Sequence, residues 1–204
     1  MKDNLRGQVT GLLSPFLRRA RNMKTASFIP DGSRILDLGC GGASLLETLL
    51  SQGKKSVSYT GVDSLADCIS AAAEVYPSQS FARLDIETAD LSSLGGPFDV
   101  VTLIAVVEHL RDPQKIFIAC RGLLSDKGKI IATAPRRGAE SLYSFGGKMS
   151  LFSKEADDEH SDKFPDKAFL ENLGAAADLH LVKYERFLLG MNQIAIYEKK
   201  GLRP

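Results

Sequence analysis

The sequence is short of cysteine, of long apolar runs and of net charge. Its 204 residues include three cysteines, and the 26 basic and 25 acidic side chains leave a formal charge of +1. Cys40, Cys68 and Cys120 are too widely spaced for a metal-ligand pattern and are odd in number, which does not suit a disulfide framework. A reducing cytosol therefore fits the chain. The balanced charge gives no reason to expect a nucleic-acid partner, since such proteins carry a basic excess.

Apolar residues occur only in short runs. No run approaches the ~18 apolar residues that a membrane span needs, and the first ten residues, MKDNLRGQVT, lack the apolar core of a signal peptide. We therefore expect a cytoplasmic protein without a membrane partner. A hydrophobic fraction of 44% and a charged fraction of 25% are ordinary for a globular protein. The length suits one α/β domain.

The order of the predicted elements alternates between strand and helix. Predicted strands cover 34–38, 56–63, 80–84, the apolar run that begins at 97, 129–133, 180–188 and 191–198, and predicted helices cover 12–28, 43–51, 66–76, 114–124 and 165–177. This order predicts an α/β fold with a doubly wound, Rossmann-like sheet that is mostly parallel, ends in an antiparallel C-terminal hairpin and carries helices on both faces. We expect residues 1–30 to form a helical segment that covers the site, residues 31–204 to form the ligand-binding domain, and residues 134–164 to form an irregular lid.

A glycine-rich turn lies in the stretch 35–43, ILDLGCGGA, between a buried strand and a helix. Glycine permits positive φ and lets a ligand lie against bare backbone. In doubly wound sheets, ligands bind outside the carboxyl ends of the strands, where the strand order reverses. The candidate positions are therefore the turn after Leu38, Asp63 at the end of the second strand, Asp85 with Ile86 after the third, and 104–109 after the fourth.

Acidic residues at successive strand ends suit a nucleoside. Asp63 is placed to accept hydrogen bonds from two ribose hydroxyls, and Asp85 from an adenine amino group, with Ile86 packing on the ring. Asp37 indicates which nucleoside, because a carboxylate two residues before the first glycine repels a pyrophosphate and favours a ligand with an ammonium and a sulfonium. The third glycine of a dinucleotide fingerprint is Ser44 here. These features favour S-adenosylmethionine over NAD.

At these residues the sequence resembles the class I S-adenosylmethionine-dependent methyltransferases, especially the small-molecule branch that includes the ubiquinone-biosynthesis O-methyltransferases. The resemblance runs from residue 34 to about residue 198 and rests on ILDLGCGGA, GVDSL, LDIE, FDVVTLIAVVEHL and GKIIATAP. It implies that the glycines lie against the methionine part of the cofactor, with the first aspartate near its ammonium, directly or through water. The cofactor-binding residues that it implies are Asp37, Gly39, Gly41, Asp63, Ser64, Asp85, Ile86 and Ile104.

Two histidines are candidate catalytic bases for proton removal from an acceptor. His109 follows the fourth strand and His160 lies in the irregular stretch, and an imidazole has an unperturbed pKa of about 6.5. A purely structural role for His109 is the alternative. In some relatives a Glu-His pair here, completed by a histidine from the later loop, binds a divalent metal, so Glu108 with both histidines leaves that alternative open. The two-glutamate version of that site would need a glutamate at Ala105, and we predict no metal.

The predicted function is transfer of a methyl group from S-adenosylmethionine to an oxygen, nitrogen or carbon of a small-molecule acceptor. The fourth strand is followed neither by Asn-Pro-Pro-Tyr or Asp-Pro-Pro-Tyr nor by a cysteine nucleophile, which argues against methylation of DNA amino groups and of the cytosine ring. A nicotinamide-dependent oxidoreductase and a non-catalytic interaction module with a nucleotide-binding fold are the alternatives. The sequence is compatible with a monomer or a homodimer.

Overall fold

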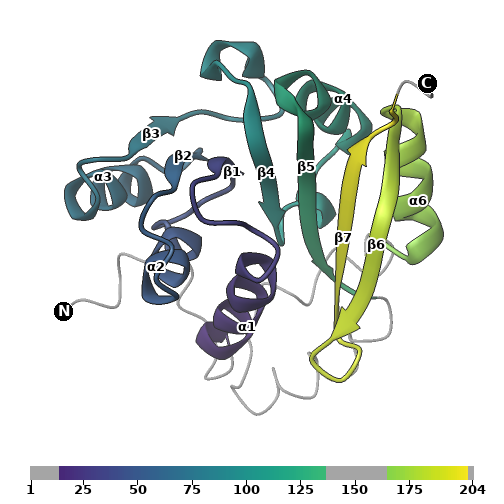
Figure 1. The fold of residues 1–204 in the computed structure, drawn as a ribbon, viewed down its shortest axis with the longest axis horizontal. Helices are drawn as coiled ribbons and strands as arrows, with labels where there is room; N and C mark the ends of the chain where they lie inside the picture. Colours follow the sequence, from purple (N-terminus) through teal and green to yellow (C-terminus); the bar gives the residue numbers. More distant parts are fainter. Residues whose placement is uncertain (1–13, 137–164, 202–204) are drawn as a thin grey trace.

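A seven-stranded sheet in the order β3-β2-β1-β4-β5-β7-β6 forms the centre of the molecule (Figure 1). The computed structural model describes residues 14–136 and 165–201. The strands are β1 (Arg34–Leu38), β2 (Ser58–Asp63), β3 (Ser80–Arg83), β4 (Phe98–Ile104), β5 (Leu124–Pro135), β6 (Leu179–Phe187) and β7 (Asn192–Lys199). Strands β1 to β5 pair in parallel, and β7 runs antiparallel to both of its neighbours.

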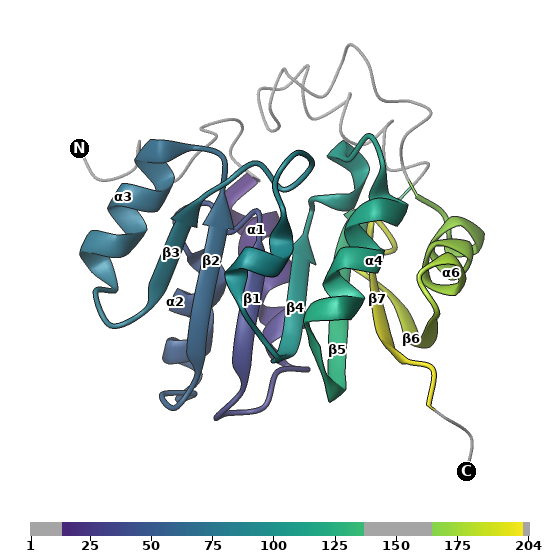
Figure 2. The same ribbon diagram turned by 90° about the horizontal axis from the view of Figure 1, so that it is seen from above.

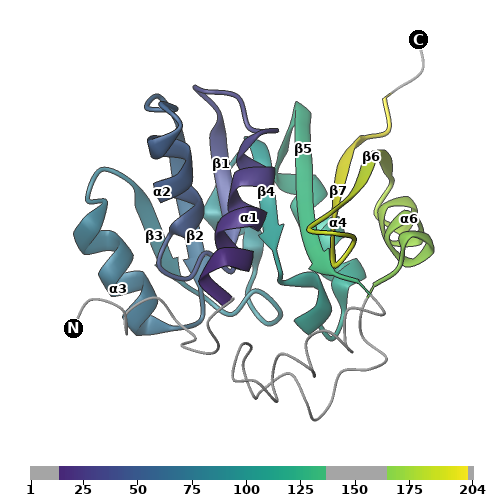
Figure 3. The same cartoon turned by 90° about the horizontal axis from the view of Figure 1, so that it is seen from below.

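Helices cover both faces of the sheet, which is why the central strands are apolar on both sides. Figure 2 shows α4 (Pro113–Leu123) and α6 (Lys167–Ala176) in front of one face. Figure 3, from the opposite side, shows α1 (Ser14–Ala26), α2 (Ser44–Ser51) and α3 (Ala66–Val75) on the other. Each layer has its own buried apolar cluster, so the sheet separates two cores. Two short 3-10 helices, η1 (Leu91–Leu94) and η2 (Val107–His109), flank β4.

The predicted fold class is confirmed, with one local difference in strand β5. Strand β5 begins at Leu124, before the predicted start at 129, because Leu124 pairs with Phe98 and the ladder resumes at Val100 and Lys129 after a register shift. The predicted antiparallel C-terminal hairpin is present, and its second strand, β7, lies between β5 and β6. Residues 1–13 and most of the expected lid, 137–164, lie outside the described residues, and so does His160.

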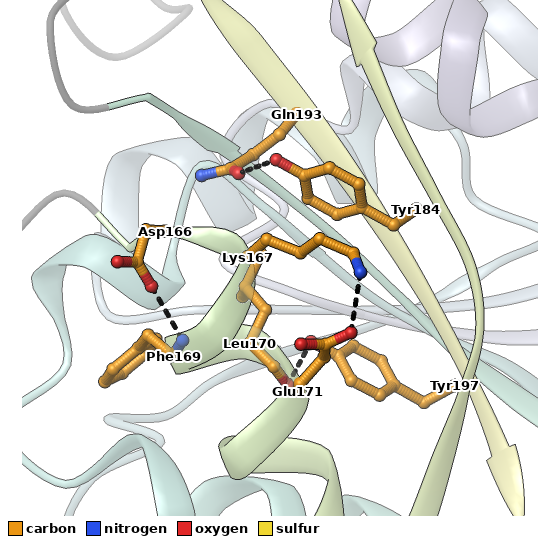
Figure 4. Close-up of polar contacts among 8 residues, drawn as sticks. All are labelled: Asp166, Lys167, Phe169, Leu170, Glu171, Tyr184, Gln193 and Tyr197. Atoms are coloured by element: carbon orange, nitrogen blue, oxygen red, sulfur yellow. Dashed lines mark hydrogen bonds and ion pairs between the residues drawn. The ribbon is translucent and has the colours of Figure 1, made fainter.

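Helix α6 is fixed to the C-terminal strands by buried polar contacts (Figure 4). The Tyr197 hydroxyl donates to the Leu170 carbonyl at 3.1 Å, and the Tyr184 hydroxyl donates to Gln193 Oε1 at 2.9 Å. The amide nitrogen of Gln193 donates to the carbonyls of Pro135 and Pro165. Because Gln193 joins the end of β5 to the residues that lead into α6, the two sides of the undescribed segment 137–164 are held together.

The strand ends meet at one edge of the sheet. Leu38 pairs with Val62 on one side and with Leu103 on the other. The residues that follow these three are Gly39, Asp63 and Ile104, so the register alone brings them together. Because β1 lies between β2 and β4, the chain reverses its winding direction there, and this is the position at which such sheets bind ligands.

Two helical glycines provide a matched test of the packing. A Cβ on Gly174 in α6 would lie 2.7 Å from the Tyr197 ring, whereas a Cβ on Gly122 in α4 would meet nothing within 4 Å. Tyr197 is held by its hydroxyl bond and by an edge contact with Phe117, so it cannot yield easily. We expect Gly174→Ala to lower the free energy of unfolding by about 1–3 kcal/mol and Gly122→Ala to raise it by about 0.5–1 kcal/mol in urea unfolding. Equal stability of the two variants would contradict this packing.

Candidate functional site

The glycine turn after β1 is tied to the end of β2 by backbone hydrogen bonds. The amides of Gly39 and Cys40 donate to the Val62 carbonyl at 2.8 and 3.0 Å, and the Gly41 amide donates to Asp63 Oδ2 at 2.8 Å. Gly39 and Gly41 have φ values of 76° and 51°, in the region that favours glycine. The turn therefore has a fixed shape and presents exposed main chain at Gly39.

The segment after β4 packs directly against this turn. A Cβ on Gly39 would lie 2.6 Å from Val106 Cγ2, a distance that real Cβ atoms do not show. The close approach follows from a sharp bend at Ala105, where φ is 54° and the amide donates to the Thr133 carbonyl at 2.9 Å. Glycine at position 39 is thus required both by its own conformation and by Val106.

Asp37 lies beneath the turn and is 2% exposed. Its Oδ2 accepts a hydrogen bond from the Tyr59 hydroxyl at 2.5 Å, and its Oδ1 accepts one from the Thr102 hydroxyl at 2.6 Å. Burial raises the pKa of Asp37 to about 6, against the lowering effect of these two bonds, and the nearby Asp63 raises it slightly further. The carboxylate is therefore mostly ionised at neutral pH, in a place where few water molecules screen its charge.

The other predicted cofactor residues also lie after the ends of parallel strands. Asp63 is half-buried, and its Oδ1 accepts from the Leu65 amide at 3.0 Å while Oδ2 holds Gly41. Ser64 and Asp85 are exposed, whereas Ile86 and Ile104 are half-buried. Asp85 Oδ1 accepts from the Glu87 amide at 3.0 Å, which fixes the bend after β3. The register brings Asp63 and Ile104 to the glycine turn, and Ser64 follows Asp63 directly.

The two residues after Val107 have different surroundings. His109 is exposed, whereas Glu108 is 8% exposed and its Oε2 has no hydrogen-bond partner among the residues that the structure describes. Burial raises the pKa of Glu108 to about 7, while a bond from its own amide and the charge of Arg21 act in the lowering direction. Within residues 14–136 and 165–201, no three His, Cys, Asp or Glu side chains gather as a metal site. His160, the other predicted base, is not among these residues.

Helix α1 contacts the same edge. The Asn22 side chain donates to Ser44 Oγ at 2.9 Å, directly after the glycine turn, and Asn22 is buried. Its neighbour Arg21 has a buried Nε without a partner in the described part of the chain. The predicted N-terminal helix is therefore present, and the charge of its Arg21 acts on the Glu108 carboxyl.

Sequence comparison assigns the chain to a family. It matches the model described as Methyltransferase domain over residues 6–184. The ubiquinone biosynthesis O-methyltransferase of Xanthomonas axonopodis pv. citri (strain 306) is 32% identical over 117 residues, which cover 55% of this chain and 47% of that protein. The protein of the same name from Coxiella burnetii (strain Dugway 5J108-111) is 29% identical over 126 residues, covering 60% and 52%. The chain spans about half the length of these curated relatives.

Solved structures share the fold. The plantazolicin methyltransferase BpumL in complex with SAH has a TM-score of 0.71 at 18% identity, covering 92% of this chain and 86% of that one. An S-adenosylmethionine-dependent methyltransferase from Clostridium acetobutylicum ATCC 824 has a TM-score of 0.66 at 15% identity, covering 90% and 92%. The fold is thus that of the class I, S-adenosylmethionine-dependent methyltransferases. The chain belongs to the methyltransferase-domain family, as the resemblance in its motifs predicted.

Four residues at the site were not predicted from the sequence. Tyr59 and Thr102 hold Asp37, and Arg21 and Asn22 bring α1 to the strand ends. The one available signal was strand alternation, which puts Tyr59 and Thr102 on the same face as Asp37 once the register is known. Nothing in the spacing of α1 identified Arg21 as different from the other arginines of that helix.

Because the Glu108 carboxyl is buried, we expect it to lower the free energy of unfolding in a pH-dependent way. Its pKa is higher in the folded state, about 7, than its ordinary value of 4.5, so the folded protein binds the extra proton between these values. The free energy of unfolding is therefore highest below the ordinary pKa of Glu108 and falls as the pH rises through its folded-state pKa. Since glutamine does not ionise, we expect Glu108→Gln to be more stable than the wild type by about 1–3 kcal/mol at about pH 8, and nearly equal to it at about pH 4.5.

Urea unfolding at both pH values measures this difference. Glu198 lies at an exposed position near the C-terminal end of β7. Glu198→Gln is therefore the matched control, and its free energy of unfolding should equal that of the wild type at each pH. A stability difference between Glu108→Gln and the wild type that does not change with pH would show that the Glu108 carboxyl is not desolvated.

Proposed function

We propose that this chain transfers the methyl group of S-adenosylmethionine to an oxygen, nitrogen or carbon nucleophile of a small-molecule acceptor. The observation that carries the proposal is the glycine turn itself, held by Asp63 on one side and underlain by the ionised Asp37. A bare main chain above a buried negative charge suits a cationic amino acid and disfavours a pyrophosphate. The relatives named above are O-methyltransferases, which agrees with this reaction class.

We assign different parts of the cofactor to different residues of the site. We assign the methionine part to Gly39 and Gly41, with the field of Asp37 acting on its ammonium. The two oxygens of Asp63 each accept one internal bond and keep capacity for one ribose hydroxyl. We assign the adenosine flank to Ser64, the adenine edge to Asp85 and Ile86, and the floor beneath the cofactor to Ile104. These assignments extend the sequence-based prediction.

The chain's own part in the reaction is alignment and exclusion of water. S-adenosylmethionine supplies a methyl group already activated on a sulfonium, so the protein needs to hold the acceptor in line with it. Helix α1, fixed by Asn22 to Ser44, borders the turn from one side, and the bend at Ala105 borders it from the other. We propose that residues 1–30 cover the site and that the segment 134–164 acts as its lid.

Other features of the protein are proposed on separate grounds. The three cysteines are buried and unbridged, which supports a cytoplasmic location. Within the described residues, no helix has the length and apolar character to cross a bilayer. A monomer or a homodimer remains the prediction for the assembly. His109 and His160 remain candidate bases, and no metal is assigned.

Asp63 provides the direct test of cofactor binding. We expect Asp63→Ala to weaken binding of S-adenosylhomocysteine by about 10- to 1000-fold, because charge-assisted hydrogen bonds to two hydroxyls are lost together. Asp63→Asn, which keeps an acceptor for the Gly41 amide, separates ribose binding from support of the turn. Isothermal titration calorimetry gives the affinities. Asp67→Ala, an exposed acid in the first turn of α3, is the control and should leave binding unchanged.

Two outcomes would contradict the assignment. An unchanged affinity of Asp63→Ala would remove the ribose role of this carboxylate. Tight binding of NADH by a wild-type protein that does not bind S-adenosylmethionine would instead favour the oxidoreductase alternative. Cofactor binding without turnover on a broad panel of acceptors would favour the non-catalytic module.

A further inference from the structure

Two buried polar atoms, one in α1 and one in η2 after β4, have no partner in the described part of the chain. Arg21 Nε is a hydrogen-bond donor, and Glu108 Oε2 is an acceptor. Buried polar groups are almost always paired, because an unpaired one carries a desolvation cost of about 1–3 kcal/mol. The Glu108 residue is only 8% exposed. The charge of Arg21 acts on its carboxyl group. A donor and an acceptor left open together indicate a binding position.

The two side chains reach this position from separate elements that both contact the cofactor turn. Asn22, next to Arg21 in α1, bonds to Ser44 at 2.9 Å, and Ser44 follows the turn. Val106 lies two residues before Glu108 and packs against the turn, since a Cβ built on Gly39 would be 2.6 Å from Val106 Cγ2. The pair thus belongs to the edge of the sheet at which the methyl group would be presented.

The same face continues with uncharged polar groups. Thr25 Oγ1, one helical turn after Arg21, and both side-chain polar atoms of Asn192 are also buried without partners among the described residues. Asn192 alternates with Ile194 and Ile196 along β7, and these two pack in the cluster that includes Ala26 of α1. The polar groups therefore line the side of the sheet that α1 covers.

We propose that Arg21 and Glu108 bind and activate a hydroxyl group of the methyl acceptor, with Arg21 Nε–H donating to its oxygen and Glu108 Oε2 receiving its proton. A hydroxyl is the group that offers one donor and one acceptor at a single atom, which matches the two open atoms. This inference rests on the proposed methyltransferase function and narrows it to oxygen. It also assigns the base to Glu108, which is buried, in preference to the exposed His109.

The reaction balances with these two residues. The hydroxyl proton passes to Glu108 Oε2 as the oxygen forms its bond to the methyl carbon. The carbon–sulfur bond breaks, and its electron pair stays on sulfur, which changes from a cationic sulfonium to a neutral thioether. The guanidinium of Arg21 stabilises the negative charge that develops on the oxygen. Glu108 afterwards releases the proton to solvent, so the protein returns to its starting state.

Phenols are suitable probes for this base, because their hydroxyl proton, with a pKa of about 10, is removed more easily than that of an aliphatic alcohol.

Methylation of two phenols by Glu108→Gln tests the proton transfer. The probes are phenol, which is neutral at about pH 8, and 4-nitrophenol, which is largely ionised there and needs no base. We expect the variant to lose about 10²- to 10⁴-fold in kcat with phenol and less than about 10-fold with 4-nitrophenol. A purely structural defect would lower both rates alike, and glutamine keeps the size of the side chain. Arg21→Gln should lower both rates, because the guanidinium acts on the oxygen in either case.

The controls and the contradicting results are distinct. Glu198→Gln, at an exposed position in β7, should methylate both phenols at the wild-type rate. Equal loss with both phenols in Glu108→Gln, or selective loss of phenol methylation in His109→Gln instead, would overturn the role of Glu108. A wild-type protein that binds S-adenosylhomocysteine by calorimetry but methylates neither phenol would overturn the hydroxyl assignment. A protein that binds no cofactor would overturn the proposed function itself.

Discussion

The rest of the site depends on the burial of one ionised carboxylate beneath the glycine turn. A charge as deeply buried as that of Asp37 is tolerated only when its oxygens are hydrogen-bonded, and here Tyr59 from β2 and Thr102 from β4 supply the bonds. These partners join the three strands whose ends form the cofactor edge. The turn above the carboxylate must then avoid side chains of its own, which Gly39 and Gly41 satisfy. Charge, strand register and backbone conformation thus depend on one another.

Both buried acids of the site are held at a cost to stability. Burial raises the pKa of Asp37 to about 6 and that of Glu108 to about 7, so each is more easily charged in the unfolded chain than in the native one. An apolar residue at position 108 would remove this cost, whereas one at position 37 would leave the Tyr59 and Thr102 hydroxyls without their acceptor. Proteins accept such costs at positions where activity requires them. The two acids differ in one respect, because Asp37 is fully bonded whereas Glu108 Oε2 stays open among the described residues.

The sequence predicted what is encoded locally, and missed what depends on distant contacts. The turn ILDLGCGGA and the acid of GVDSL are consecutive residues whose roles follow from strand ends, so Gly39 and Asp63 were found together. Asp37 was expected to face the ligand, but its partners, Thr102 and Tyr59, lie 65 and 22 residues away and become visible only through the register. Arg21 was not predicted, because the helical spacing of α1 does not show that its charge acts on a glutamate 87 positions later. The start of β5 was misplaced at residue 129, since the pairing of Leu124 with Phe98 joins distant segments and is not visible in the local sequence.

The position of β7 also bears on how the chain is made. It follows β6 in the sequence, and it supplies hydrogen bonds to β5 on one side and to β6 on the other. Until β7 has been synthesised, β5 ends the sheet with an open row of amides and carbonyls, and β6 has no place to attach. During translation the nascent protein therefore carries an unpaired sheet edge until β7 closes it, and a chaperone would be of most use in that period.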